Sequence, residues 1–256
     1  MHRRVRLGSI LSQYAFARVL AQRFAYRLAT VPVPGFPGTL TASHGEEILG
    51  PLIRWNGQWP FDAYSGRPLL LDELYQAPGA QIRLHGGFQR YDLFASESEA
   101  ICDEWLRLPD SRPRLSIADF VIGLDTDRRD FLTLDGSLSE LEIRRLVRTV
   151  SHKRLYLLTD SLTNPMVKQL SDLNAEVVVK REMDSLLFIQ SFQKIALGQS
   201  ALHWWGAFLG KAKEIYFPKI DRGPWSHPEP TMLAVDPEHY GIDLRVMGQE
   251  RWIYHW

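Results

Sequence analysis

Short apolar runs alternate with helix-like segments between residues 120 and 217, and this alternation constrains the fold more than any other feature. The segments between the runs carry apolar residues at helical spacing, as Ile143, Leu146 and Val150 do. Strands that alternate with helices predict an α/β fold in which helices cover both faces of a parallel, Rossmann-like sheet. The runs that have the length of buried strands are 120–124, 155–158, 176–179, 195–197 and 214–217.

The first half of the chain is less regular. A helix is predicted from about Ser9 to Leu28, with apolar residues at steps of four, and residues 81–84 form a strand-like run. Loops rich in proline and glycine separate these two elements, and a last helix passes through Ile101 and Trp105. Two prolines interrupt the pattern at 109–113, which places a domain boundary there and predicts lobes at 1–110 and 111–256.

Composition and charge exclude several classes of protein. The chain has 256 residues, of which 45% are hydrophobic, and a formal net charge of zero, so nothing global favours a nucleic-acid partner. The single cysteine, Cys102, cannot form an internal disulfide, which fits a reducing compartment. The sequence has no run of about 18 apolar residues and no small-residue cleavage site after its basic start. We therefore expect a cytoplasmic protein without a membrane span.

Ligands of open parallel sheets bind outside the carboxyl ends of the strands, and phosphates favour helix N-termini. The stretch from Leu197 to Ser200 has this position, because it joins a predicted strand to a helix that Ser200 is expected to cap. Gln199 and Ser200 are therefore candidates for anion binding, and Trp204 is a candidate wall of the pocket. The alternative is that Ser200 is only a cap and that Trp204 and Trp205 only fill core volume.

Other candidates also follow predicted strands. Asp125 and Arg128 come after the run 120–124, where an arginine suits a phosphate, although a solvated charged turn is an equal alternative. Asp160 follows the run 155–158 and is either a helix cap or a ligand contact. His85 follows the run 81–84 and is either a general base or a structural histidine.

Several common sites are absent from the sequence. The eight histidines show no metal-binding spacing, and Cys102 has no second cysteine, so no metal site is expected. The sequence also lacks the GxxxxGK[ST], GxSxG and GxGxxG motifs. No cofactor is therefore expected.

Four stretches, in order, resemble the bacterial alpha-1,2-fucosyltransferases. RLGSILSQYAFARVLA (6–21) is similar to the family's GGLGNQLFQYAFGRALA, and HGGFQRYDLF (85–94) is similar to its GYFQSEKYF segment. LYLLTDS (155–161) stands where the family has a strand that ends in FSDD. ALGQSALHWWGAFLGKAKEIYFPK (196–219) resembles ISNSSFSWWAAWLN…VIAPK. The resemblance thus covers nearly the whole chain.

This resemblance implies an inverting, metal-independent glycosyltransferase with a GT-B-like fold, in which two Rossmann-like lobes each contain a parallel sheet. The first strand would be short, at 4–7, and Gly8 and Ser9 would form the turn after it and approach the donor. The donor would be a nucleotide sugar, GDP-fucose in the family, and Asp160 would meet its base or ribose. Trp55 and Trp59 would stack against the acceptor glycan.

The family's HxRRGD motif is altered in this chain, where the corresponding stretch is FVIGLDTDRRDF (120–131). If Asp130 matches the family's aspartate, Arg128 falls on the second arginine and would stabilise the leaving pyrophosphate. If Gly123 matches the histidine, both arginines are lost. His85 and Asp125 are the candidate bases for the acceptor hydroxyl.

Two functions from different classes follow. The first is an enzyme of polysaccharide biosynthesis that takes a nucleotide sugar and a glycan acceptor and associates peripherally with a glycan-assembly system. The second is a noncatalytic relative that binds a nucleotide or a glycan, which the altered HxRRGD stretch favours. A glycosyltransferase with another nucleotide sugar is a third alternative.

Overall fold

The structure is a computed structural model, and its described residues fall into two compact units. The first unit contains residues 6–8 and most of the second half of the chain, and the second contains described residues between 9 and 107. The predicted boundary between residues 110 and 111 lies outside the described residues and stays a prediction. The described residues are 6–23, 28, 30, 33–37, 39, 52–56, 59–62, 81–85, 94–108, 118–124, 138–197, 200–210, 212–218 and 252–255.

The first unit is built on a parallel sheet, as the sequence predicts. Five strands pair in the order β6-β5-β4-β7-β8, all of them parallel, and β9 adds to β8 in the same direction. All of β4 and all but the first residue of β5 are buried, which explains why these strands are continuous apolar runs in the sequence. The strands are β4 (Asp119–Gly123), β5 (Arg154–Thr159), β6 (Glu176–Val179), β7 (Lys194–Leu197), β8 (Glu214–Pro218) and β9 (Trp252–His255).

The strand order reverses beside β4. From β4 the chain proceeds outward through β5 to β6, and it then returns to place β7 on the opposite side of β4. This is the doubly wound, Rossmann-like order, and its topological switch point lies between β4 and β7. The α/β class and the parallel sheet predicted for this half of the chain are therefore confirmed.

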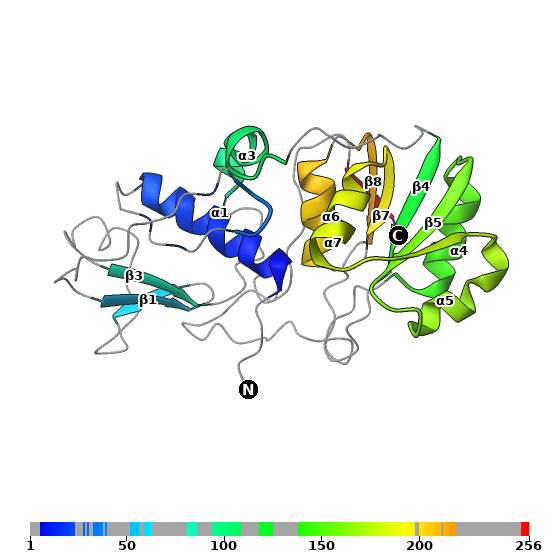
Figure 1. The fold of residues 1–256 in the computed structure, drawn as a ribbon, viewed down its shortest axis with the longest axis horizontal. Helices are drawn as coiled ribbons and strands as arrows, with labels where there is room; N and C mark the ends of the chain where they lie inside the picture. Colours follow the sequence, from blue (N-terminus) through cyan, green and yellow to red (C-terminus); the bar gives the residue numbers. More distant parts are fainter. Residues whose placement is uncertain are drawn as a thin grey trace. The chain divides into compact units, whose positions relative to one another are not determined.

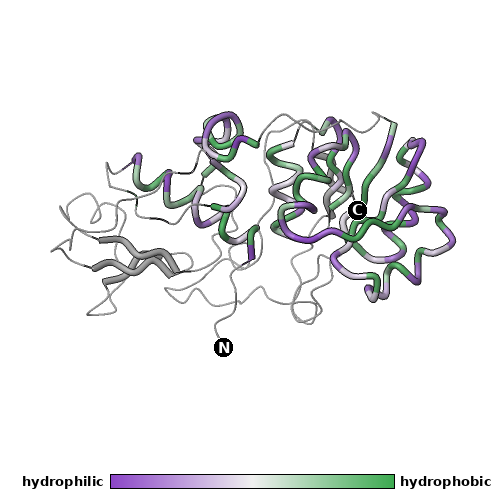
Figure 2. Tube along the Cα trace, in the orientation of Figure 1, coloured by the Kyte–Doolittle hydropathy of each residue, from purple (hydrophilic) through white to green (hydrophobic). Residues whose placement is uncertain are grey.

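Helices cover both faces of this sheet. Figure 1 draws α6 and α7 on one side of β4 and β7, and α4 and α5 on the other. Figure 2 shows β4 and β5 as hydrophobic, whereas the helices mix hydrophilic and hydrophobic residues, as expected for elements with one face in the core. The helices are α4 (Glu140–Thr149), α5 (Pro165–Gln169), α6 (Glu182–Gln190) and α7 (Ala201–Leu209), with a 3₁₀ turn at Ser171–Leu173.

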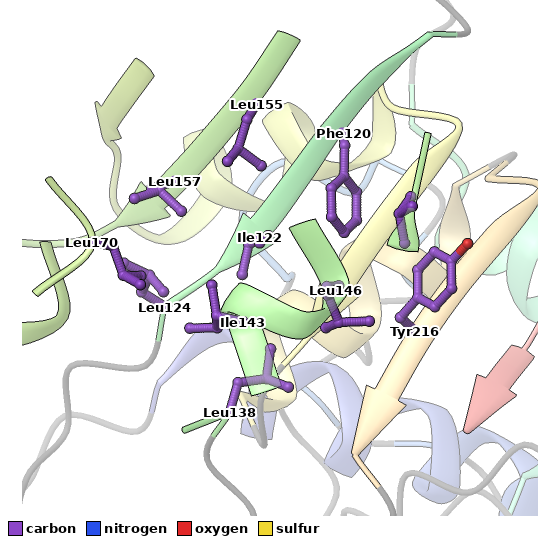
Figure 3. Close-up of a cluster of buried hydrophobic side chains, with 12 residues drawn as sticks. Phe120, Ile122, Leu124, Leu138, Ile143, Leu146, Leu155, Leu157, Leu170 and Tyr216 are labelled. Atoms are coloured by element: carbon purple, nitrogen blue, oxygen red, sulfur yellow. The ribbon is translucent and has the colours of Figure 1, made fainter. Parts of the chain in front are cut away.

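Successive side chains along the strands point to opposite faces of the sheet and enter two separate cores. On one face, Ile122 and Leu157 point toward Ile143 and Leu146 of α4 (Figure 3). On the other face, the ring of Tyr156 packs against aromatic rings of α6 and of the residues that follow it. Both faces of the central strands β4 and β5 are therefore buried, whereas the edge strand β6 is mostly exposed. The ligand-accessible parts of the central strands are their ends.

The second unit contains a long helix and a small mixed sheet. Strand β1 (Leu52–Asn56) pairs antiparallel with β2 (Trp59–Asp62) and parallel with β3 (Gln81–His85). The family resemblance implies a parallel sheet here, and this is wrong for β1 and β2, because only two residues join them and a parallel pair needs a long crossover. A helical segment of three short pieces follows: Ala95–Glu97, Ser98–Ala100 and Ile101–Trp105.

Helix α1 (Leu7–Arg23) corrects the predicted start of the chain. A first strand is expected at 4–7, but Leu7 is already helical. Gly8 and Ser9 therefore lie in the first turn of α1 and not in a turn after a strand. None of the helices in the described parts of the chain is both long enough and apolar enough to cross a membrane.

Candidate functional site

The candidate site lies at the carboxyl end of the switch point between β4 and β7. Gly123 pairs there with Leu197 of β7 on one side and with Leu158 of β5 on the other. The N–H group of Leu124 donates to the carbonyl of Leu158 at 2.8 Å, which extends the β4–β5 pairing past the last residue of β4. In doubly wound sheets the crevice at this point is where ligands bind.

The N-terminus of α7 lies at this end of the sheet. Ser200 caps the helix, because its hydroxyl oxygen accepts a hydrogen bond from the N–H group of His203 at 3.4 Å. The predicted capping role of Ser200 is therefore confirmed. The first N–H groups of a helix carry a positive partial charge, so this turn favours an anion.

Gly8 brings the start of α1 against the start of α7. A Cβ atom on Gly8 would lie 2.6 Å from the backbone nitrogen of Leu202 and 2.9 Å from the carbonyl carbon of Ala201. Both neighbouring atoms belong to the backbone, so only a glycine permits this approach. Gly8, which belongs to the same unit as α7, therefore lies directly against the first turn of that helix.

The two helices that meet at Gly8 have no acidic residue in their first turns. The first turn of α4, by contrast, contains Glu140 and Glu142, and Glu142 closes a capping box with Ser139. The first turn of α6 also contains two carboxylates. The positive ends of α4 and α6 are thus balanced by their own side chains, whereas those of α1 and α7 are not.

His203 is the buried polar residue of the site. It is 7% exposed, and its Nδ1 atom has no hydrogen-bond partner among the described residues. The imidazole ring fills the space above β4, because a Cβ atom on Gly123 would lie 2.5 Å from Nδ1. Burial lowers the pKa of His203 to about 4, and the carboxylate of Asp160 opposes this shift. The ring is therefore neutral near pH 7.

Asp160 follows β5 in a hydrogen-bonded turn. The hydroxyl of Thr159 accepts from the N–H group of Ser161 at 3.3 Å, and the Ser161 and Thr163 hydroxyls share a hydrogen bond of 2.7 Å. Asn164 caps α5 by accepting from the N–H group of its second residue. Asp160 is thus not the cap, and its exposed carboxylate lies close enough to His203 to affect its pKa.

The two adjacent tryptophans pack α7 into the core. Trp204 is 1% exposed and stacks on Phe208 with ring centroids 4.8 Å apart. Trp205 is completely buried and meets both rings edge to face. Packing is the role that the structure describes for both residues, and the donor contact of Trp204 stays a prediction.

Several predicted site residues cannot be placed in this site. Asp125, Arg128 and Gln199 lie outside the described residues. For Trp55, Trp59 and His85 the structure describes the backbone alone, in β1, β2 and β3. The strand register places both Trp59 and His85 opposite Asn56, so these two predicted residues share one end of the small sheet.

The structure therefore brings together Gly8, Ser200 and Asp160 from the predicted set, with Ser9 beside Gly8 in the first turn of α1. It adds His203 and Gly123, neither of which was predicted as a site residue. In the sequence, the features that could have indicated these two residues are a histidine in the first turn of a predicted helix and a glycine near the end of an apolar strand. Among the described residues, no group of three metal-ligating side chains is present.

Comparison of the chain with protein-family models, with curated proteins and with solved structures found no match.

Proposed function

We propose that this chain is an inverting glycosyltransferase that transfers a sugar from a nucleotide donor to a hydroxyl of a glycan, with GDP-fucose as the first donor to test. The observation that carries the proposal is the contact of Gly8 with the first turn of α7. Residues 6–21 and 196–219 are two of the four stretches that resemble the fucosyltransferases, and they are far apart in the sequence. Their meeting at a switch point is what a shared donor site requires.

The geometry suits the leaving group of such a reaction. The acceptor oxygen forms a bond to the anomeric carbon from one face, while the bond from that carbon to the diphosphate oxygen breaks on the other. The departing diphosphate gains negative charge, which the N–H groups at the start of α7 stabilise. Arg128 would add a full positive charge at the same step.

The remaining predicted residues take roles around this centre. The hydroxyl proton of the acceptor passes to a base, for which His85 and Asp125 are the candidates. Asp160 contacts the base or ribose of the nucleotide, and Trp55 and Trp59 stack on the acceptor sugar. Ser9, Gln199 and Trp204 complete the donor side, as the resemblance implies.

The proposal includes a setting for the enzyme. The reaction needs no metal or cofactor beyond the nucleotide sugar. It takes place in the cytoplasm, in a protein that associates peripherally with a glycan-assembly system for polysaccharide biosynthesis. The predicted GT-B-like arrangement of two lobes belongs to this proposal.

A noncatalytic binding protein is the second candidate, and the altered stretch 120–131 favours it. The donor site at Gly8 and α7 serves either function, because both need to hold a nucleotide. Another nucleotide sugar would use the same anion site with a different base and sugar pocket.

Thermal unfolding with a panel of nucleotides, with and without EDTA, tests the proposal. The panel contains GDP, GDP-fucose, GDP-mannose, UDP, UDP-glucose, dTDP and CMP. A ligand at about a hundred times its dissociation constant adds about 2.7 kcal/mol to the free energy of unfolding. Stabilisation by GDP and GDP-fucose that does not depend on EDTA is expected, followed by release of GDP when a glycan acceptor is added. No stabilisation by any nucleotide would refute the donor site.

A substitution connects this assay to the site. Gly8→Ala places a Cβ atom within 2.6 Å of a backbone nitrogen, so the two helix starts have to separate. Nucleotide stabilisation is therefore expected to disappear in a variant that remains folded by circular dichroism. Ala17→Gly, in the middle of α1, is a control that weakens the same helix by about 1 kcal/mol away from its start.

A further inference from the structure

His203 occupies a position that packing alone does not explain. Its side chain is more than nine-tenths buried in the first turn of α7, yet it carries a nitrogen without a partner among the described residues. A buried polar atom without a partner destabilises the folded protein, and an apolar ring of similar shape would not have this effect. A residue kept at such a cost to stability is a candidate for function.

The contact with Gly123 assigns the position of the imidazole proton. A Cβ atom on Gly123 would lie 2.5 Å from Nδ1, so the Cα–H bond that replaces it points at this nitrogen. A proton on Nδ1 would meet that hydrogen, whereas the lone pair of an unprotonated Nδ1 makes a weak C–H contact with it. The neutral ring therefore carries its proton on Nε2, and Nε2–H is a hydrogen-bond donor.

The ring atoms nearest to a Cβ atom on Gly123 are Nδ1, Cε1 and Cγ, so this contact does not occupy Nε2 and leaves it as the atom for a ligand. The described charged group that acts on the ring is the carboxylate of Asp160, and no acidic residue lies in the first turn of α7. Asp160 is exposed, so solvent screens its repulsion of an anion. A neutral donor next to a helix start suits the oxygen of a phosphoryl group.

We propose that His203 is a positioning residue of the donor site, and that its Nε2–H group donates a hydrogen bond to a phosphoryl oxygen of the diphosphate bound at the first turn of α7. This inference rests on the proposed function, which supplies the diphosphate. The inference goes beyond the proposed function because it assigns a residue, a tautomer and a hydrogen bond. At the position of His203, the similar family motif ISNSSFSWW has serine.

Two variants of the full chain separate this role from packing. His203→Phe keeps a planar ring and removes both nitrogens, whereas His203→Gln retains an N–H donor at a similar reach. Inorganic pyrophosphate and GDP are titrated into each protein by calorimetry. The affinity of His203→Phe is expected to fall by about 10- to 100-fold, because a hydrogen bond to a charged group is lost. His203→Gln is expected to recover part of this loss.

Nuclear magnetic resonance of the ring nitrogens gives a readout that packing does not affect. In the free protein, the signals of His203, assigned by their absence in His203→Gln, are expected to show a protonated Nε2 and an unprotonated Nδ1. Addition of pyrophosphate is expected to shift the Nε2 proton downfield, as a hydrogen bond to phosphate does. This measurement needs only the wild-type fold, so it tests the proposal even if His203→Phe does not fold.

The outcomes are distinguishable. Equal affinities of the wild type and His203→Phe, or a proton on Nδ1, would overturn the role of His203 and leave the proposed function standing. If the wild type binds neither pyrophosphate nor GDP, the anion site itself is refuted, and the proposed function falls with it. Weaker binding by His203→Phe, together with the Nε2–H signal, supports both.

Discussion

Acidification is expected to destabilise this protein through His203, and the effect can be isolated by substitution. Burial lowers the pKa of the ring from 6.5 to about 4 in the folded protein, whereas the unfolded chain restores the ordinary value. Between these two values the unfolded state binds the proton and the folded state does not. The free energy of unfolding therefore falls as the pH drops below about 6.5, until it levels off below about 4.

The size of the effect follows from the two pKa values. At about pH 5 the solution is about 1.5 units below the unfolded pKa, and the folded ring is still mostly neutral. Each unit corresponds to about 1.4 kcal/mol, so His203 lowers the free energy of unfolding by about 2 kcal/mol between about pH 7.5 and pH 5. This is a large part of the stability of an ordinary domain, which is about 5–15 kcal/mol.

Urea unfolding at both pH values, on the wild type and on His203→Phe, measures this contribution. Other groups titrate in both proteins and cancel in the comparison, so the wild type is expected to lose about 2 kcal/mol more than the variant. Asp160→Asn removes the carboxylate that opposes the shift. Because the folded ring is already mostly neutral at about pH 5, this variant is expected to leave the loss between the two pH values nearly unchanged and to extend it to lower pH. If the wild type and His203→Phe lose the same free energy, the ring is not buried in its neutral form, and the tautomer argument fails with it.

Three further predictions concern the same end of the sheet and the stretch beside it. Ser200→Ala is expected to lower the free energy of unfolding by about 1 kcal/mol, measured by urea unfolding, and to weaken GDP binding, measured by calorimetry. Ser139→Ala removes the cap of α4 and should lower the free energy of unfolding by a similar amount without changing the affinity for GDP. Gly123→Ala should destabilise the folded protein by about 1–3 kcal/mol, because its Cβ atom overlaps the imidazole of His203. In a double-mutant cycle, His203→Ala should relieve much of this loss, and additive effects of the two substitutions would contradict the contact. Arg128→Ala should reduce turnover by about 100-fold or more in a transfer assay, and an unchanged rate would remove Arg128 from the mechanism.

The sequence predicts the elements of the sheet unit well because their signals are local. The apolar run at 176–179 coincides with β6, and Asn164 and Ser200 cap the helices that follow them, as their hydrogen-bonding chemistry favours. Helix α6 has a weaker signal in the sequence than α4, because its apolar residues, Leu186 to Ile189, are contiguous. A helix that packs both against α7 and, through Phe188, against Tyr156 of the sheet has little polar face, so its periodicity is weak.

The site is less accessible to sequence reasoning. Ser200 and Asp160 are site candidates in the sequence because each follows a strand, and this position is readable along the chain. His203 was missed because its significance depends on Gly123, which is 80 residues away in sequence. The role of Gly8 was expected, but its setting in the first turn of a helix was not.

By itself, the sequence determined the α/β class of the second half, its strands and the capped starts of its helices, since backbone geometry and capping depend on neighbouring residues. Only the tertiary structure decided that β7 returns to the far side of β4, that Gly8 meets Leu202 and that His203 lies over Gly123. These contacts join segments separated by many residues, and their free energy depends on which surfaces become buried together. No local pattern records that choice, because it is made when the helices and strands pack.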